Sequence, residues 1–227
     1  MLQSFSRLAV LAALACCGSV FAQEREWVPY KKLLEITSMD KFYSAPLAQR
    51  DKIKLRGYLM PNNKAIKPQD VVLTIAHADG KERIQINADG AFELVPTAKA
   101  LKENPMVFTN VPAGEKASVS YAVLAVVPDG LKFSYTGLTA GVKQAADLIK
   151  SKAGMLSMFA PKFNGVEIAF SKPAKQTLQI VAKAGTQTLT ADVKGVIKLK
   201  VDAGLLNEDP QVVFSERPVE VGLATDL

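Results

Sequence analysis

His77 is the only imidazole in the chain and the residue best suited to acid–base chemistry near neutral pH. It follows Leu73 and Ile75 in strand-like alternation and precedes Asp79-Gly80, which is typical of a tight turn. A catalytic triad would need a nucleophile and a carboxylate that converge on this ring. A histidine metal site would need further ligands, which this chain offers only as carboxylates. We therefore expect His77 to lie at the rim of a strand, with a packing or turn role.

Ser38-Met39-Asp40-Lys41 matches the Ser-x-x-Lys spacing of penicillin-recognising enzymes. In that spacing a lysine one helical turn after the serine can activate its hydroxyl. The chain contains no Ser-Asp-Asn or Lys-Thr-Gly element to complete such a site. We therefore expect Ser38 to be a helix cap or a surface residue.

Two further segments imitate ligand-binding loops. Gln85 to Gly90 places oxygen donors at alternate positions before a glycine, as a calcium loop does, but its twelfth position is Pro96 rather than Glu. Gly137 to Lys143 has three residues between its glycines and lacks the Gly-Lys-Ser/Thr end of a phosphate loop. A strand followed by a turn explains the first segment, and the start of a helix explains the second.

The chain is basic, with 28 Lys and Arg against 22 Asp and Glu and a net charge of +6. The densest basic cluster, Lys52, Lys54 and Arg56, alternates with apolar residues and so predicts the outer face of a strand. Because the excess charge is spread along the whole chain, we expect no nucleic acid partner.

A shift of 105 positions aligns the chain with itself. The matching pairs are Lys67-Pro68 and Lys172-Pro173, Leu73 and Leu178, Ile75 and Ile180, Gly80 and Gly185, Gly90 and Gly195, Leu94 and Leu199, Leu101 and Leu206, Glu103 and Glu208, Pro105 and Pro210, and Val107 and Val212. These are mostly apolar, glycine and proline positions, which specify a fold. We predict a tandem duplication of a module of ~105 residues, divided at the turn Pro128-Asp129-Gly130, with repeat 1 over 23–128 and repeat 2 over 129–227.

Each repeat is expected to contain a three-stranded meander with one apolar face. In repeat 1 the strands are predicted at 72–77, 84–86 and 92–94, with turns at Gly80 and Gly90. In repeat 2 they are predicted at 178–180, 189–193 and 197–201, with turns at Gly185 and Gly195. Glycine suits these turns because it adopts positive φ without steric cost.

Further strands must cover the apolar face of each meander. The candidates are Ile53 to Leu59, Val107, Val119 to Val123, Val166 to Phe170, Val212 and Val219 to Leu223. The predicted fold is therefore mainly β, with antiparallel β-sandwich-like modules. Short helices are predicted before Asn104-Pro105 and Asp209-Pro210, and the longest helix from Thr139 to about Ser151.

The first 22 residues have the pattern of a secretory signal peptide. Arg7 precedes an apolar run over 8–17, and a small-x-small exit ends at Ala22. Cleavage there predicts a mature chain that begins at Gln23. No later stretch approaches the roughly 20 apolar residues of a transmembrane helix.

Both cysteines, Cys16 and Cys17, fall inside the predicted signal, so the mature chain would contain no thiol and no disulfide. The same segment also approximates a lipoprotein signal. That alternative stays open, and it is the one route by which we expect contact with a membrane.

These patterns predict an exported, non-catalytic envelope protein, periplasmic or secreted, that acts as a binding or protein-interaction module. Its partner would be an unidentified protein or envelope polymer. We assign no catalytic, cofactor-binding or metal-ligating residue. Two alternatives remain: a small exported hydrolase, whose catalytic residues would break the repeat in one copy, and a scaffold subunit of an envelope assembly, which would expose a large apolar patch.

Overall fold

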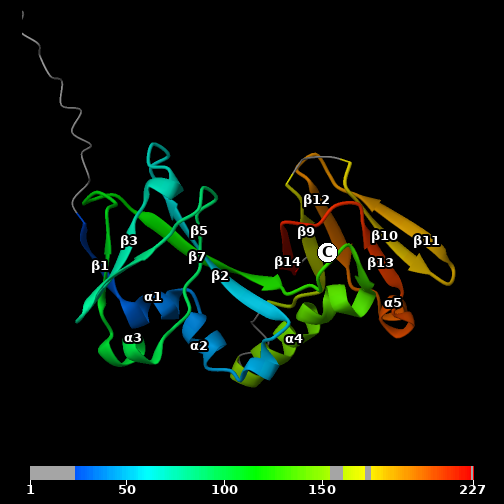
Figure 1. The fold of residues 1–227 in the computed structure, drawn as a ribbon, viewed down its shortest axis with the longest axis horizontal. Coiled ribbons are helices and arrows are strands. Elements are labelled where there is room, and N and C mark those ends of the chain that lie inside the picture. The colour runs from blue at the N-terminus through cyan, green and yellow to red at the C-terminus, as the bar shows by residue number, and fades with distance from the viewer. Residues whose placement is uncertain (1–23, 154–160, 172–174, 226) are drawn as a thin grey trace, which may run out of the picture.

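The computed structural model describes residues 24–153, 161–171, 175–225 and 227 (Figure 1). In this part of the chain the protein is mainly β, with antiparallel sheets and, apart from one helix of 19 residues, only short helices. The predicted signal segment, its cleavage after Ala22, and Cys16 and Cys17 lie outside the described residues.

The first half contains seven strands and three short α-helices. The strands are β1 (Arg25–Pro29), β2 (Ile53–Pro61), β3 (Leu73–His77), β4 (Gly80–Ile84), β5 (Ala91–Phe92), β6 (Met106–Thr109) and β7 (Ala117–Ala125). The helices are α1 (Tyr30–Ile36), α2 (Met39–Tyr43) and α3 (Ala98–Glu103), with 3₁₀ turns at Leu47–Gln49 and Pro68–Asp70.

The second half also contains seven strands in the described residues. They are β8 (Lys132–Ser134), β9 (Gly165–Ala169), β10 (Thr177–Ala182), β11 (Gly185–Thr190), β12 (Val196–Lys200), β13 (Gln211–Phe214) and β14 (Glu220–Ala224). Its helices are the long α4 (Tyr135–Ala153) and the short α5 (Ala203–Glu208).

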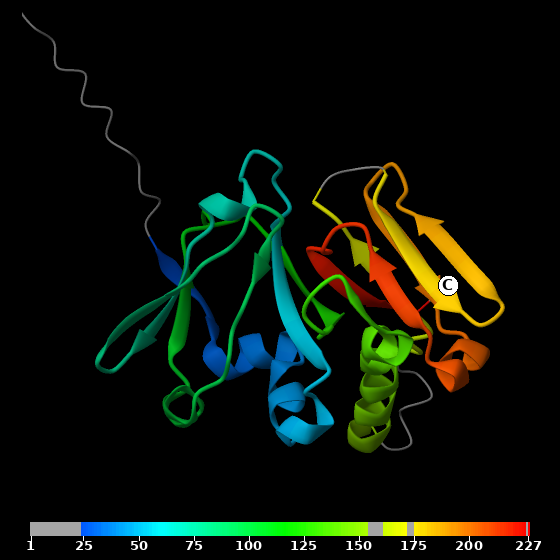
Figure 2. The same ribbon diagram turned by 45° about the vertical axis from the view of Figure 1, so that its right-hand side comes forward.

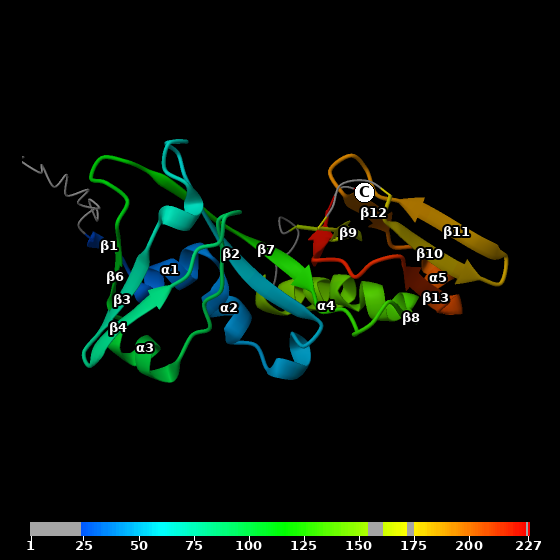
Figure 3. The ribbon, with the colours of Figure 1, turned by 45° about the horizontal axis from the view of Figure 1, so that its top comes forward.

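The strands form three sheets. One sheet in each half has four strands, in the order β1-β6-β3-β4 in the first half and β8-β13-β10-β11 in the second. The remaining strands form one six-stranded sheet, β5-β2-β7-β14-β9-β12, to which each half contributes three. The two contributions meet at one pairing, Gly222 opposite Leu124. The two halves therefore lie side by side along a shared sheet, and each has its own four-stranded sheet (Figures 1 and 3).

The predicted three-stranded meander is wrong in both halves. β3 and β4 form the expected hairpin, but β5 pairs with β2 in the other sheet, and β12 likewise pairs with β9. The crossing begins at Gly90, whose φ of +85° turns the chain and whose carbonyl accepts a 2.9 Å bond from the Leu59 N–H. Ile86 before this turn and Phe92 after it are both buried. Alternation indicates which residues of a strand face the core, but it does not indicate the sheet to which the strand belongs. A strand that crosses to the opposite sheet buries the same apolar residues in the same core.

The second strand predicted for the second half, 189–193, is also displaced toward the C-terminus, since β11 begins at Gly185. β11 ends at Thr190, and Val193 is 85% exposed. The Asp192 side chain accepts from the N–H groups of Lys194 and Val196, which closes a turn where continued alternation was expected. The predicted turns at glycine are confirmed, since Gly80, Gly90, Gly185 and Gly195 all have positive φ.

The short helices before the two prolines are confirmed, and their ends are built alike. Thr97 caps α3 by accepting from the Ala100 N–H, and Asp202 caps α5 by accepting from the Leu205 N–H. Each helix ends on a left-handed residue, α3 on one with φ +48° (Asn104) and α5 on one with φ +49° (Asp209). An asparagine or aspartate tolerates that conformation better than most residues.

A buried tyrosine begins the first helix of each half. The N–H of Tyr30 donates to the Pro105 carbonyl at 2.9 Å, and the N–H of Tyr135 donates to the Pro210 carbonyl at 2.9 Å. Both side chains are at most 1% exposed. α4 therefore starts four residues before the predicted Thr139, because these contacts satisfy N–H groups that a helix start otherwise leaves without partners.

The core has two parts, one in each half. Helix α4 contributes to both, because Leu138 and Val142 pack in the second core while Ala145 packs in the first. The helical spacing of Val142, Ala145, Ala146 and Ile149 predicts one apolar stripe. Of these residues, Val142 and Ala145 are buried, whereas Ala146 is exposed. The sequence predicts that this helix lies between the two modules or caps the second one, and the structure places it between the halves, where it packs against both (Figure 2).

Candidate functional site

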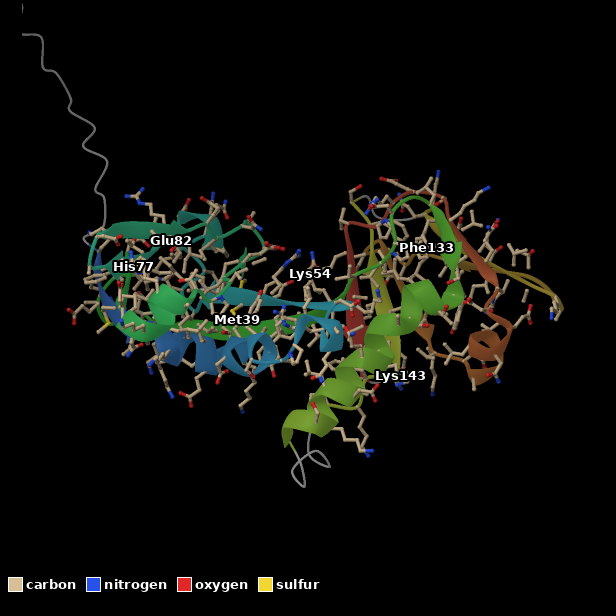
Figure 4. All side chains as sticks on the ribbon, turned by 60° about the horizontal axis from the view of Figure 1, so that its bottom comes forward. Met39, Lys54, His77, Glu82, Phe133 and Lys143 are labelled. Carbon is tan, nitrogen blue, oxygen red and sulfur yellow. The ribbon has the colours of Figure 1, made fainter. Side chains whose placement is uncertain are left out.

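His77 ends β3 and lies between two carboxylates. Its Nδ1 is 3.3 Å from Oε2 of Glu103, and its Nε2 is 3.3 Å from Oε2 of Glu82. The imidazole is 11% exposed, and Figure 4 shows His77 and Glu82 next to one another in the first half. A carboxylate only accepts hydrogen bonds, so the doubly protonated ring is the form that donates to both.

This arrangement leaves the ring without a nucleophile. Both ring nitrogens face acids, and no hydroxyl is hydrogen-bonded to the ring among the described residues. The described residues also contain no group of three or more His, Cys, Asp or Glu side chains that could hold a metal ion. The contacts of His77 are those of a strand-end residue tied to β4 and α3.

The two segments that imitate binding loops are parts of regular structure. Asp89 accepts the N–H of Ala91 at 3.0 Å, and with Gly90 it forms the turn before β5. Gly137 and Lys143 both lie within α4. Lys143 is largely exposed and pairs with Asp147 at 2.5 Å, one turn further along the helix.

The structure divides the basic cluster. Lys52 precedes β2 and pairs with Asp51, whereas Lys54 lies on the outer face between the halves, as Figure 4 shows. Arg56 is only 19% exposed and forms an ion pair with Glu220 of β14. This pair joins the two halves across the shared sheet, so the charge of Arg56 is compensated within the fold rather than presented to a partner.

An apolar cavity of about 270 Å³ lies where α2 and α4 approach β2 and β7. Of the twelve described residues that line it, nine are apolar: Phe42, Ile53, Leu55, Val123, Ala145, Leu148, Ile149, Pro161 and Phe163. The other three are Ser38, Lys41 and Tyr121. Most binding sites for small molecules are apolar hollows with a few polar groups that orient the ligand.

The polar side of the cavity comes from the segment that the sequence singled out for its Ser-x-x-Lys spacing. Ser38 is the N-cap of α2, with a left-handed φ of +55°, and its side chain makes no capping hydrogen bond. Lys41 is exposed, and no ion pair of its ammonium occurs among the described residues. The structure therefore brings Ser38 and Lys41 to the cavity, and Ser38 occupies the predicted cap position of a helix without making a capping hydrogen bond.

Sequence reasoning missed the cavity itself. Ile53 and Leu55 were expected under a meander, and Ile149 on the buried stripe of a helix. The cavity forms because these side chains from both halves meet without filling the space between them.

A second and larger hollow, about 820 Å³, lies on the other side of α4. Ala146 and Lys143 line it, and Leu148 and Phe163 line both hollows. Its lining includes the charged residues Lys52, Lys143 and Asp147 beside apolar ones. By residue type, the smaller cavity therefore has the larger apolar share of its lining.

No known protein family, curated protein or solved structure matches the chain. Within the described residues, no helix combines the length and the apolar character needed to cross a membrane.

Proposed function

We propose that this protein is an exported, non-catalytic binding module of the bacterial envelope, built by tandem duplication of a β-sandwich-like unit, which holds a small amphiphile in the cavity between α2 and α4. The observation that carries the proposal is the cavity, because nine of the described residues that line it are apolar and Lys41, which has no ion pair among the described residues, stands at its rim. The proposed export and the periplasmic or secreted location rest on the pattern of residues 1–22.

The matching strand orders support the duplication. Counterparts at the offset of 105 share special geometry: Gly80 and Gly185 at one turn, Gly90 and Gly195 at the next. Unrelated halves have no physical reason to place four positive-φ glycines at one constant offset.

The lining argues for an amphiphile of a particular kind. A cavity of this size accommodates a chain or ring of about ten non-hydrogen atoms. The ammonium of Lys41 would attract an anionic group at the mouth, while Leu148 and Phe163 would contact the apolar part. A medium-chain carboxylate satisfies both requirements, and for a ligand of this size we expect a Kd of about 1 mM or below.

The test is a calorimetric titration with sodium octanoate, repeated with octanol, which lacks the charge. Ile149→Trp should abolish binding because it fills the cavity. Ala146→Trp is the matched control, since it adds the same side chain to the same helix on the side of the larger hollow. Lys41→Gln should weaken octanoate by about three- to tenfold and leave octanol unchanged. Absence of saturable binding, or loss of binding in Ala146→Trp alone, would contradict the proposal.

A small hydrolase is the second candidate, and the geometry of Ser38 favours it. The serine has a left-handed backbone conformation, which is strained for any residue other than glycine, and such strain is concentrated at functional sites. Against this role, a lysine that serves as a base must be desolvated, and Lys41 is exposed. Labelling of Ser38 by a fluorophosphonate, with Ser38→Ala as the control, would favour the hydrolase over the binding module.

A further inference from the structure

The described residues contain six sheet edges, and five of them have features that prevent pairing with another strand. β5 and β8 have only two and three residues, β1 ends in Pro29, and β12 presents Lys198 and Lys200. Edges of this kind are short, charged or interrupted by proline, which prevents pairing with other chains. β4, with the sequence Gly-Lys-Glu-Arg-Ile, is charged along most of its length.

β11 is the exception. Its six residues, Gly-Thr-Gln-Thr-Leu-Thr, include no charge and no proline, and all but Leu189 are exposed. β11 pairs only with β10, and the three ribbon views place it at the outer margin of the molecule (Figures 1, 2 and 3).

The contrast with β4 is sharp because the two strands occupy the same place in their sheets. Each is the outer strand of a hairpin at the end of a four-stranded sheet. At the offset of 105, Lys81 corresponds to Thr186 and Arg83 to Thr188. The charges that protect one edge are thus replaced by threonines on the other, and β-branched threonine favours strand pairing.

The hydrogen-bond pattern shows which groups β11 presents. Ala191 N–H donates to the Gln176 carbonyl at 2.9 Å, so that pair is hydrogen-bonded toward β10. Hydrogen-bonded pairs recur at every second position of an antiparallel ladder. Thr186, Thr188 and Thr190 therefore direct their N–H and C=O groups away from β10, toward the free edge.

We propose that β11 pairs with β11 of a second copy of this chain, antiparallel and centred on Thr188, to form a two-fold symmetric dimer with a continuous eight-stranded sheet. A two-fold axis at Thr188 places threonine opposite threonine at all three hydrogen-bonding positions, because Thr186 then faces Thr190 of the other copy. Cross-strand threonine pairs stabilise a sheet, and like charges directly opposite one another destabilise it. A second copy suits this edge because the spacing of its threonines is self-complementary.

The test is the oligomeric state of the full chain by sedimentation velocity, over about 1 to 300 μM. The native protein should show a concentration-dependent dimer. The double variant Thr186→Lys/Thr188→Arg installs the residues of the protected edge and should weaken the dimer by about tenfold or more. Gln179→Lys is the matched control, because it adds a charge on the central strand β10 and should leave the dimer unchanged.

Amide hydrogen exchange locates the interface independently and distinguishes dissociation from misfolding. The N–H groups of Thr186, Thr188 and Thr190 should gain protection as concentration rises, while that of Gln187, which bonds within the hairpin, should stay protected throughout. A native chain that remains monomeric over the whole range would overturn the proposal. A dimer that persists in the double variant, or a dimer that leaves these three amides unprotected, would also overturn it. The same holds if β11 pairs only with an extended peptide of another protein and not with a second copy.

Discussion

Gly57 of β2 lies opposite Phe92 of β5, and the aromatic ring covers the glycine. A Cβ added at Gly57 would lie 2.6 Å from Cε2 and 2.7 Å from Cε1 of that ring, and closer still to Cζ. Phe92 is 1% exposed, so the ring has no free space into which to move. We expect Gly57→Ala to lower the free energy of unfolding by about 1–3 kcal/mol, the usual cost of overpacking a core.

The matched control is Gly222→Ala in β14. Gly222 is also a strand glycine without positive φ, but a Cβ there would lie 3.8 Å from its nearest neighbour, the carbonyl oxygen of Glu167. That substitution should leave the free energy of unfolding unchanged or raise it by about 0.4–1 kcal/mol, because alanine restricts the unfolded chain. Urea denaturation followed by circular dichroism measures both.

The second half has a different residue pair at the corresponding place in the shared sheet. Ile197 corresponds to Phe92 at the offset of 105, and its partner across the sheet is Ile168 rather than glycine. The double variant Gly57→Ala/Phe92→Leu should therefore be more stable than the sum of its single variants by about 1 kcal/mol or more. If Gly57→Ala were as stable as Gly222→Ala, or if the double variant were simply additive, the argument from the ring contact would be refuted.

Three further outcomes are expected. The N–H of Thr136 donates to the Asp209 carboxylate at 2.8 Å and lowers the pKa of Asp209. The stabilisation of the folded state by this bond is therefore complete above about pH 5 and is lost as pH falls through the pKa of Asp209. Asp209→Asn should remove that part of the acid dependence in urea titrations at pH 3–6. His77→Gln should lower the free energy of unfolding by about 1 kcal/mol or less and leave the affinity for octanoate unchanged. A folded variant that no longer binds octanoate would show that His77 has a functional role. Gly90→Val should lower the free energy of unfolding by more than about 2 kcal/mol in thermal and urea denaturation. The reason is that Gly90 has a positive φ and that a Cβ there would lie 2.7 Å from the Leu59 carbonyl oxygen. A loss of stability no larger than that of Lys81→Ala would contradict this reason.

Local features of the fold could be predicted because they depend on residues close in sequence. The hairpin between β3 and β4 needs Gly80 at its turn, and α3 needs Thr97 as its cap and a stop before Pro105. These signals act within a few residues, so one sequence suffices to find them. The mainly β character and the antiparallel sheets followed from the same local alternation.

The choice of sheet could not be predicted from alternation. Phe92 is buried on β5 whether that strand pairs with β4 or with β2, so its apolar character is the same in both arrangements. The outcome depends on the long-range approach of Leu59 to the carbonyl of Gly90. Likewise, the Arg56–Glu220 pair joins residues 164 positions apart, and the sequence presents each of them only as a surface charge.

The cavity arises from a difference between the halves in the helices that follow their first strands. After Tyr30 the chain forms two short helices, because Thr37 bonds the carbonyls of Leu33 and Leu34 and Ser38 turns into the left-handed region. After Tyr135 it forms one helix of 19 residues, which extends beyond its own half. The broken helix places α2 against β2, and the unbroken one brings its C-terminal turns to the same strand pair. The cavity between these helices therefore depends on both halves, and either half folded alone would supply only part of its lining.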